Sequence, residues 1–435
     1  MTYDAVLLAP PSRAINHYRP PLSLIHLGGY LKHKGLNVKI IDVPMKQVVR
    51  NRAFWKNKDT MINRIKEQML TEVESVNSRY LGISCYSTEY SEVRQMIFDL
   101  RRISKAKIIV GGIHPTLCPN DFNDIADHIV RGLGEMCLYG IITGQKKVEA
   151  KSLDEFCYPD YDLVDMDYYT QANPYCIRGV YLRATYLLAG YGCPSSCTFC
   201  VAKTLRPFFG SGQIRNPQRI LEDILYLKNR YAIDGFYFID DLFTVNKQKV
   251  LDFCSLIAGE DLIWGCSSKV TTLNEGLIKA MSEAGCVQMD FGVERGSNEA
   301  LSKLKKGQTV EKIREIFDLC KKYGIRTFAN MLVNIPEETE QDLLDIKRLL
   351  DKIQPNITSV NIFEGYIGTE LPDKKPNKET LQFAQSITKK FSPLWKNLFS
   401  HFNKRYIRIV KNSKRKFNYL KQLWTLLQEL INQSL

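Results

Sequence analysis

Three cysteines, Cys193, Cys197 and Cys200, stand within a run of eight residues in this 435-residue chain. Thiolates at this spacing can converge on one metal centre, and soft sulfur ligands select iron–sulfur clusters, zinc or copper. A closed zinc site or a fully ligated four-iron cluster needs four protein ligands. Three close cysteines without a near fourth therefore predict a [4Fe–4S] cluster with one iron left open for a substrate or cofactor. Three structural cysteines, or a zinc knuckle, are the alternative.

The element in front of these cysteines must position them. Residues 185–189 form an apolar run that predicts a β-strand, so the cysteines would follow on the loop at its carboxyl end. Parallel α/β folds build their chemistry at this end of the strands. The cysteine loop is thus expected at the ligand-binding edge of a sheet.

The strand belongs to the second of two α/β series. Over residues 1–147, short apolar strands alternate with helical stretches, which predicts a Rossmann-like parallel sheet with crossover helices. Residues 148–180 are rich in Asp, Tyr and Pro and predict a linker. Six strand–helix repeats over residues 181–373 predict an incomplete barrel, a partial (β/α)6 form of the TIM barrel. Residues 374–435 predict a basic helical C-terminal region.

The predicted strands can be compared directly with a structure. In the first series they cover residues 5–9, 38–41, 80–84, 107–110 and 128–130. In the second series they cover residues 183–190, 235–239, 262–267, 287–293, 326–333 and 359–363. Charged amphipathic stretches such as 217–230 and 310–322 predict the helices between them.

The composition limits the class of protein. Hydrophobic residues make up 44% and charged residues 25% of the chain, which is typical of a soluble globular protein. We find neither a signal peptide nor an uninterrupted apolar stretch of the ~18 residues that a membrane span needs. Twelve cysteines in so long a chain do not predict a disulfide framework, and the tight trio indicates a reducing compartment. We therefore expect a cytoplasmic protein.

The net charge of +13 is concentrated near the C-terminus. Eleven basic residues and no acidic residue lie between Glu379 and Glu429, so the rest of the chain carries about +2. Aromatic residues are interleaved with these charges. The favoured interpretation is a solvated helical cap on the barrel. Peripheral contact with an anionic membrane, or with a carrier protein, is the alternative, and nucleic acid is disfavoured as a partner.

With the cysteine motif on the first strand of a partial barrel, the chain resembles the radical S-adenosylmethionine (radical SAM) superfamily. Four further segments match in order: 240–244, 292–297, 333–339 and 366–370. The resemblance implies that the three cysteines hold a [4Fe–4S] cluster whose open iron chelates the amino and carboxylate groups of SAM. It implies further SAM contacts from Asp240, Asp241, Lys269, Glu294, Asn334 and Pro336.

Some of these positions depart from the family pattern, and others have a purely structural role as the alternative. Asn334 and Glu337 stand where the family usually has glycines, and Lys269 stands where many members carry arginine. The two aspartates could instead form a loop or helix cap. Glu294 could form a structural ion pair with Arg295 or Lys269.

The N-terminal series resembles the cobalamin-binding domain that precedes many radical SAM enzymes, through segments 20–31, 82–88, 110–116 and 131–135. The Asp-x-His-x-x-Gly motif that supplies a histidine to cobalt in many mutases is absent, so the resemblance implies base-off cobalamin without a histidine ligand. His114 is expected to shape its loop. The alternative is a degenerate module that holds no corrinoid. The implied cofactor contacts are Ser84, Ser87, Thr88, Gly111, Gly112, Gly132 and Glu135.

The resemblance implies an enzyme that methylates an unactivated carbon through a 5′-deoxyadenosyl radical and methylcobalamin. A related radical enzyme that catalyses cyclisation or another C–C or C–H transformation is the second hypothesis. A non-catalytic iron–sulfur or corrinoid sensor is the third. The implied partners are a small-molecule or lipid-like substrate and a reductant such as a flavodoxin or ferredoxin. The sequence names neither the substrate nor the catalytic residues.

Overall fold

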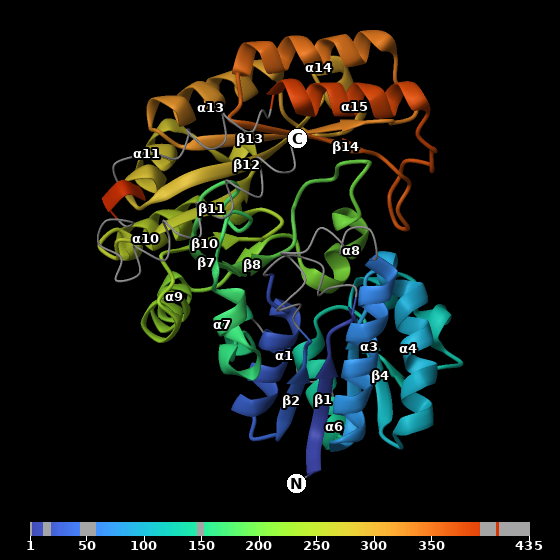
Figure 1. The fold of residues 1–435 in the computed structure, drawn as a ribbon. Helices are drawn as coiled ribbons and strands as arrows, with labels where there is room; N and C mark the ends of the chain where they lie inside the picture. The colour runs from blue at the N-terminus through green and yellow to red at the C-terminus, as the bar shows by residue number, and fades with distance from the viewer. Residues whose placement is uncertain (1, 12–18, 44–57, 146–151, 392–405, 409–435) are drawn as a thin grey trace. The chain divides into compact units, whose positions relative to one another are not determined.

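The structure is a computed structural model that describes residues 2–11, 19–43, 58–145, 152–391 and 406–408 (Figure 1). The chain divides into two compact units, both of α/β class as predicted. The predicted linker, residues 148–180, is shared between the two units. The N-terminal unit comprises Met1–Tyr169 with Leu205–Gly210, and the C-terminal unit comprises Thr170–Thr204 with Ser211–Leu435.

The N-terminal unit contains a five-stranded parallel sheet of order β2-β1-β3-β4-β5. This is the doubly wound order in which ligands bind at the switch point beyond the carboxyl ends of β1 and β3. All five predicted strands are present. The strands are β1 Thr2–Leu8, β2 Val38–Ile41, β3 Asn77–Ser84, β4 Lys107–Gly111 and β5 His128–Ile129. The helices include α1 Leu22–His33, α3 Lys58–Glu74, α4 Tyr90–Ile103, α5 Ile113–Leu117, α6 Gly134–Thr143 and α7 Met166–Tyr169.

The core of this unit explains why the apolar runs form strands. Val6, Leu81 and Val110 are fully buried at the centre of β1, β3 and β4. They form one cluster with Val93 and Ile97 of α4. Burial of each such side chain stabilises the fold by about 1.5–3 kcal/mol relative to exposure. Strands buried on both faces read as continuous apolar runs, which is the pattern in the sequence.

The C-terminal unit contains a seven-stranded sheet of order β14-β13-β12-β11-β10-β7-β6. Six strands are parallel, as the six-unit partial barrel predicts, and the short β6 is antiparallel to β7. The strands are β6 Ala172–Asn173, β7 Leu182–Leu187, β10 Gly235–Phe238, β11 Ile263–Ser268, β12 Cys286–Glu294, β13 Arg326–Val333 and β14 Ile357–Ile362. A hairpin of β8 Gly190–Tyr191 and β9 Gln213–Ile214 follows β7.

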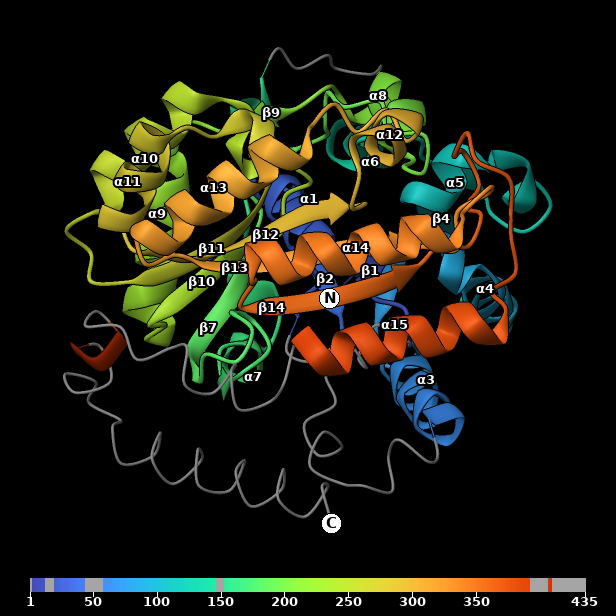
Figure 2. The ribbon, with the colours of Figure 1, turned by 90° about the horizontal axis from the view of Figure 1, so that it is seen from above.

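Helices connect these strands and follow the curve of the sheet (Figure 2). Helices α9, α10, α11, α13 and α14 pack on one another in succession. Their first turns are capped by side chains: Asn216, Thr309 and Thr339 each accept a backbone N–H bond at a helix start. Such caps contribute about 1 kcal/mol each. The helices are α8 Ala202–Phe209, α9 Pro217–Tyr231, α10 Lys247–Ile257, α11 Glu275–Glu283, α12 Asn298–Lys303, α13 Val310–Lys322 and α14 Glu340–Ile353.

The C-terminal region begins with the predicted helix. Helix α15, Lys378–Phe391, packs against β14 through buried Ala384, Ile387 and Phe391. Most of the basic residues beyond it, 392–405 and 409–435, lie outside the described residues, and so does the expected contact surface of the tail. None of the described helices is both long and apolar enough to cross a membrane.

Candidate functional site

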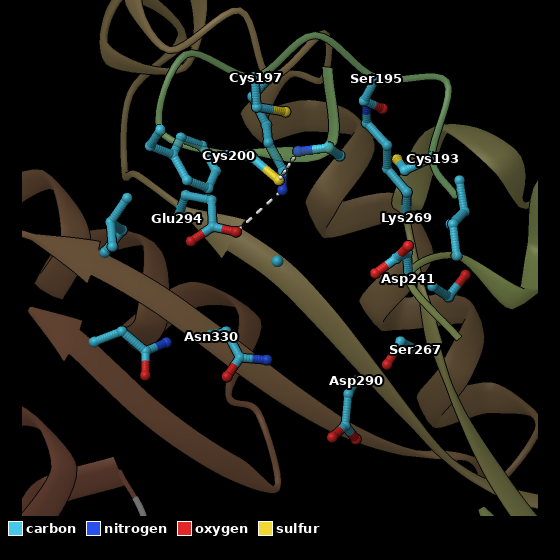
Figure 3. A pocket seen from close by; sticks show the side chains of 18 of the residues that line it. Cys193, Ser195, Cys197, Cys200, Asp241, Ser267, Lys269, Asp290, Glu294 and Asn330 are labelled. Carbon is cyan, nitrogen blue, oxygen red and sulfur yellow. Dashed lines mark hydrogen bonds and ion pairs between the residues drawn. The ribbon is translucent and has the colours of Figure 1, made fainter. Parts of the chain in front are cut away.

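A cavity of about 440 Å³ opens inside the half-barrel of the C-terminal unit (Figure 3). All its lining residues belong to this unit. They come from the segment before β7, the cysteine loop with the start of α8, the segments that follow β10 and α12, and strands β11, β12, β13 and β14 with the residue after β11. The polar and sulfur-bearing residues among them are Arg178, Cys193, Ser195, Cys197, Cys200, Asp241, Ser267, Ser268, Lys269, Asp290, Glu294, Lys306, Asn330 and Asn361.

The three cysteines predicted as metal ligands all line this cavity. Their loop lies between β8 and α8, beyond the carboxyl end of β7, as the sequence predicted. Backbone bonds fix the loop: the N–H of Thr198 donates to the carbonyl of Leu304 at 3.1 Å, and the N–H of Cys200 donates to that of Cys197 at 3.1 Å. The sulfurs are therefore held at one end of the cavity by the fold itself.

The donor chemistry of this end fits a four-iron cluster. The described residues contain no group of three or more His, Cys, Asp or Glu close enough to hold a single metal ion. A cubane binds each thiolate at a different iron, so its ligands stand further apart than those of one ion. Burial raises the pKa of the Cys197 and Cys200 thiols, while the Lys306 ammonium opposes the shift at Cys197. Iron coordination and nearby cations both favour the thiolate form.

The two predicted aspartates are separated by the structure. Asp241 lines the cavity, whereas Asp240 does not. The buried Asp240 carboxylate accepts a bond from the N–H of Ala189 at 2.8 Å. Desolvation raises the pKa of Asp240 to about 7, although bonds from the Ala189 and Gly190 N–H groups oppose the shift. Asp240 thus holds the end of the chain segment that leads into the cysteine loop.

Glu294 also lines the cavity and carries an unforeseen partner. Its carboxylate Oε1 lies 3.0 Å from Nζ of Lys306, and both side chains are largely buried. Burial lowers the pKa of Lys306, but the Glu294 carboxylate and the nearby thiols outweigh this and raise it. The ion-pair alternative for Glu294 is thus realised with Lys306 and not with the expected partners, since Arg295 pairs with Glu338 and Lys269 donates to Ser195.

Lys269 reaches the cysteine loop from the end of β11. Its Nζ donates to the hydroxyl of Ser195 at 3.0 Å. Burial, with a contribution from Lys306, lowers the pKa of Lys269. This lysine therefore brings a cation to the loop that carries the three thiols.

Asn334 and Pro336 lie outside the cavity lining. The Asn334 amide donates to the carbonyls of Phe363 and Lys374, each at 2.7 Å, and so ties three segments together. Asn334 and Glu337 both adopt positive φ, 69° and 60°. Glycine favours this conformation, which gives a physical reason for the glycines expected at these two positions.

In the N-terminal unit, the predicted cofactor residues gather at the carboxyl ends of β3, β4 and β5. Ser84 and Gly111 are paired in the sheet register. Gly112 has φ of 108°, and a Cβ there would stand 2.8 Å from the carbonyl oxygen of Cys85. A Cβ on Gly132, which has φ of 79°, would stand 3.0 Å from the carbonyl oxygen of Phe208. At these two positions the protein's own backbone therefore leaves no room for a side chain.

The loop after β3 carries Ser87 and Thr88 and is held by a buried histidine. The Nδ1 atom of His114 lies 3.1 Å from the Ser87 hydroxyl, and its Nε2 atom lies 3.1 Å from the Asp121 carboxylate. The ring packs against Tyr90 at 4.6 Å between centroids. Both ring nitrogens are engaged, as expected of a residue that shapes its loop.

Glu135, in the first turn of α6, is buried rather than displayed. Desolvation raises the pKa of Glu135 to about 7, and backbone N–H groups of Gly134 and Glu135 oppose the shift. Its Oε2 atom has no hydrogen-bond partner among the described residues. A direct contact from Glu135 to a cofactor stays a prediction.

Fold and site together define a class: a protein with a doubly wound sheet and a half-barrel whose cavity is lined by three closely spaced cysteines. Comparison with known families agrees. The radical SAM superfamily model matches residues 187–350, and the B12 binding domain model matches residues 13–142. The chain therefore carries both a radical SAM domain and a B12-binding domain. These domains imply a [4Fe–4S] cluster, SAM and cobalamin, and together with the methyltransferase relative they support a radical SAM enzyme rather than a sensor.

Relatives span more than one reaction. An uncharacterized methyltransferase of Pyrococcus horikoshii is 25% identical, covering 84% of this chain and 82% of its own length. An anaerobic magnesium-protoporphyrin IX monomethyl ester cyclase of Rubrivivax gelatinosus is 23% identical over 78% of this chain, which spans only 63% of that protein.

Solved structures share the fold. The radical SAM methyltransferase TsrM of Kitasatospora setae, solved with cobalamin and a [4Fe–4S] cluster, has a TM-score of 0.67 and 17% identity. The match covers 85% of this chain and 77% of TsrM. The cobalamin-dependent radical enzyme OxsB has a TM-score of 0.59 over 95% of this chain and 61% of its own.

Sequence reasoning missed several residues of the cavity: Arg178, Asp290, Lys306, Asn330 and Asn361. The strand sequences held a usable signal, since Asp290 and Asn330 each interrupt an otherwise apolar stretch, residues 289–293 and 328–333. Arg178 and Lys306 lie outside strands, and no local pattern marks them.

Proposed function

We propose that this enzyme is a methyltransferase that acts on an unactivated carbon of a small molecule. The observation that carries the proposal is one cavity lined by three cysteines, Asp241 and Glu294, in a chain that also has a B12-binding domain. Methyltransferases recur among the relatives and structural neighbours. Cyclisation or another radical transformation is the second candidate, favoured by the cyclase relative.

The cavity residues would divide the work between cluster and SAM. Cys193, Cys197 and Cys200 would ligate the cluster, which supplies the electron that cleaves SAM to a 5′-deoxyadenosyl radical. The carboxylates of Asp241 and Glu294 are suited to the SAM amino group, because carboxylates accept charge-assisted hydrogen bonds. The ion pair with Lys306 fixes the Glu294 carboxylate within the cavity.

The fold supplies orientation and exclusion of water. Asp240 would act indirectly, by holding the backbone of Ala189 in front of the cysteine loop. Partly buried Phe199 and buried Leu332 line the cavity beside the polar groups and would limit the access of water to a radical. Such positioning is the main contribution of a protein to cofactor chemistry.

For the N-terminal unit we propose base-off cobalamin without a histidine ligand. Both nitrogens of His114 are occupied within the loop, by Ser87 and Asp121. The glycine-lined edge of the sheet permits close approach of the corrinoid to the backbone. Cobalamin would supply the methyl group in transit between SAM and the substrate.

The experiment uses the full chain, reconstituted anaerobically with iron, sulfide and hydroxocobalamin, then reduced and given SAM with a CD3 methyl group. We expect 5′-deoxyadenosine and a CD3 group recovered on the corrinoid, both by mass spectrometry. 5′-Deoxyadenosine without labelled corrinoid would favour the second candidate. Absence of both would overturn the proposal.

The electron source remains part of this proposal. A flavodoxin or ferredoxin is the expected reductant, because cluster reduction needs a one-electron donor of low potential. Replacing the chemical reductant by a reduced flavodoxin in the same assay tests this, with 5′-deoxyadenosine as the readout.

A further inference from the structure

We propose that the deep end of the cavity binds an oxyanionic group of the substrate, a carboxylate or a phosphate, through the guanidinium of Arg178. The inference rests on the proposed function only in taking this cavity as the place where the substrate reacts. It assigns a chemical feature to a substrate that the cluster and SAM contacts leave undefined.

Arg178 enters the cavity from the end opposite the cysteines. It precedes β7, whereas the cysteine loop follows that strand. Its backbone carbonyl accepts a bond at 2.9 Å from Arg326, the first residue of β13. Its guanidinium lies 4.3 Å from the ring centroid of Phe328, two residues further along. Arg178 is thus positioned at the amino end of the strands and reaches inward from there.

The inward face of β13 shows how the cavity continues from Arg178. Side chains alternate along a strand, so Asn330 and Leu332 follow Phe328 on the same face, and both line the cavity. Asn361 is the register partner of Leu332 on β14. A ligand group above Arg178 would therefore meet neutral amides before it reached the region of the thiols.

The guanidinium is available to a ligand. Within the described part of the chain, Arg178 forms no ion pair at 4.0 Å or less. Its contact with Phe328 holds the group by a cation–π interaction without using its N–H donors. A planar fork of this kind matches a carboxylate or phosphate in bidentate geometry.

The nearest acidic side chain at this end is already engaged. Asp290 accepts a bond from the Gln288 amide at 2.9 Å, and the Tyr237 hydroxyl also bonds to it. Figure 3 shows Asp290 on the far side of the cavity from the labelled cysteines. Two guanidinium groups, of Arg178 and Arg326, act on this one carboxylate. The deep end therefore carries one net positive charge, which favours an anion.

The other charged groups of the cavity belong to its opposite end. Lys269 bonds to Ser195 of the cysteine loop, and Lys306 is paired with Glu294. These cations lie close to the thiols and to the expected SAM contacts. An oxyanion of the substrate is therefore best recognised by Arg178, which leaves the reacting part of the molecule to extend toward the cluster.

Three probes of matched size test this: benzoate, phenyl phosphate and neutral benzamide, titrated calorimetrically into the cluster-loaded full chain at pH 7.5. We expect at least one anion to bind at least tenfold more tightly than benzamide. The anion that binds distinguishes carboxylate from phosphate. Equal binding of benzamide, or no binding of either anion, would overturn the inference.

Two substitutions locate the effect. Arg178→Gln should weaken anion binding about tenfold or more, since a hydrogen bond to a charged group contributes about 1.5–3 kcal/mol. Arg178→Lys keeps the positive charge but not the planar guanidinium geometry, so it should lose less anion affinity than Arg178→Gln. Arg348→Gln, an exposed α14 arginine paired with Asp345, is the matched control. Unchanged binding by Arg178→Gln would overturn the inference.

Folding and cluster content are measured for each variant by circular dichroism and by iron–sulfur absorbance. These readouts separate the two claims. If the unsubstituted chain takes up no cluster and cleaves no SAM, the proposed function fails, while the same titrations into the cluster-free full chain still decide the role of Arg178.

Discussion

The two parallel sheets of this protein present different chemistry at the same edge. In the N-terminal unit, the carboxyl ends of the strands carry small residues and glycines, such as Gly111 and Gly112, and the loop histidine is turned to internal bonds. In the C-terminal unit, the same edge carries thiols, carboxylates and ammonium groups around a cavity. On the proposed function, the first edge would offer backbone to a large ligand, whereas the second offers reactive and charged side chains.

The difference shows how the work of two cofactors is divided. A corrinoid brings its own reactive metal, so its domain needs only shape and close approach. A cluster and SAM need protein ligands and counter-charges. Substitutions should therefore act through sterics in the N-terminal unit and through lost ligands and charges in the C-terminal unit.

The largest expected effect comes from the thiols. Replacing any one of Cys193, Cys197 and Cys200 by Ala should abolish cluster assembly and 5′-deoxyadenosine formation, because no spare thiolate ligand remains at that iron. Corrinoid retention should persist. Iron content, absorbance and mass spectrometry measure the three properties. Cys118→Ala, outside the cavity, is the control. Full SAM cleavage in any of the three variants would refute the ligand assignment.

A steric substitution should have the converse effect on the N-terminal unit. Gly112→Val places a side chain 2.8 Å from the Cys85 carbonyl at a φ of 108° and should remove most of the retained corrinoid. Gly144→Ala is a matched control, since Gly144 also has positive φ but nothing within 4 Å of its Cβ. Corrinoid stoichiometry after gel filtration measures the effect. Equal retention by both variants would show that backbone approach does not govern binding.

Some charged residues of the C-terminal unit serve the stability of the fold. Buried Arg295, which forms an ion pair with Glu338, is an example. Glu338→Gln leaves the guanidinium without its main counter-charge and should lower the free energy of unfolding by about 3–5 kcal/mol. Glu299→Gln breaks only an exposed pair with Lys303 and should cost about 0.5 kcal/mol or less. Urea denaturation compares the two. Similar losses would mean that the buried pair is not the stabilising element.

The fold could be predicted from the sequence because its signals are local. Buried parallel strands are continuous apolar runs, and β2 and β13 begin and end at the predicted residues, 38–41 and 326–333. The cysteine spacing is equally local. Helix α13 likewise covers the predicted residues 310–322.

The sequence could not predict which way a side chain points or which distant residue it pairs with. Asp240 and Asp241 are adjacent, yet one supports the backbone and the other lines the cavity. The partner of Glu294 is Lys306, from beyond the next helix, rather than its neighbour Arg295. Arg178 lines the cavity although it lies before β7, on the opposite side of that strand from the cysteine loop. No spacing in the sequence predicts this position.

The last predicted effect concerns the dependence of stability on pH. Burial raises the pKa of Asp240 to about 7 in the folded chain, against about 3.9 unfolded. The folded state therefore binds the proton more tightly, and its stability falls as pH rises between about 4 and 7, by at most about 1.4 kcal/mol per pH unit from this group. Asp240→Asn keeps the acceptor for the Ala189 N–H but cannot ionise. Urea denaturation at pH 5, 6, 7 and 8 should show the Asn variant gaining on the parent protein as pH rises and levelling off above 7. A difference in free energy of unfolding that stayed constant across this range would mean that the pKa of Asp240 is not raised. The Asp240 carboxylate would then be charged in the folded chain, like the carboxylates that line the cavity.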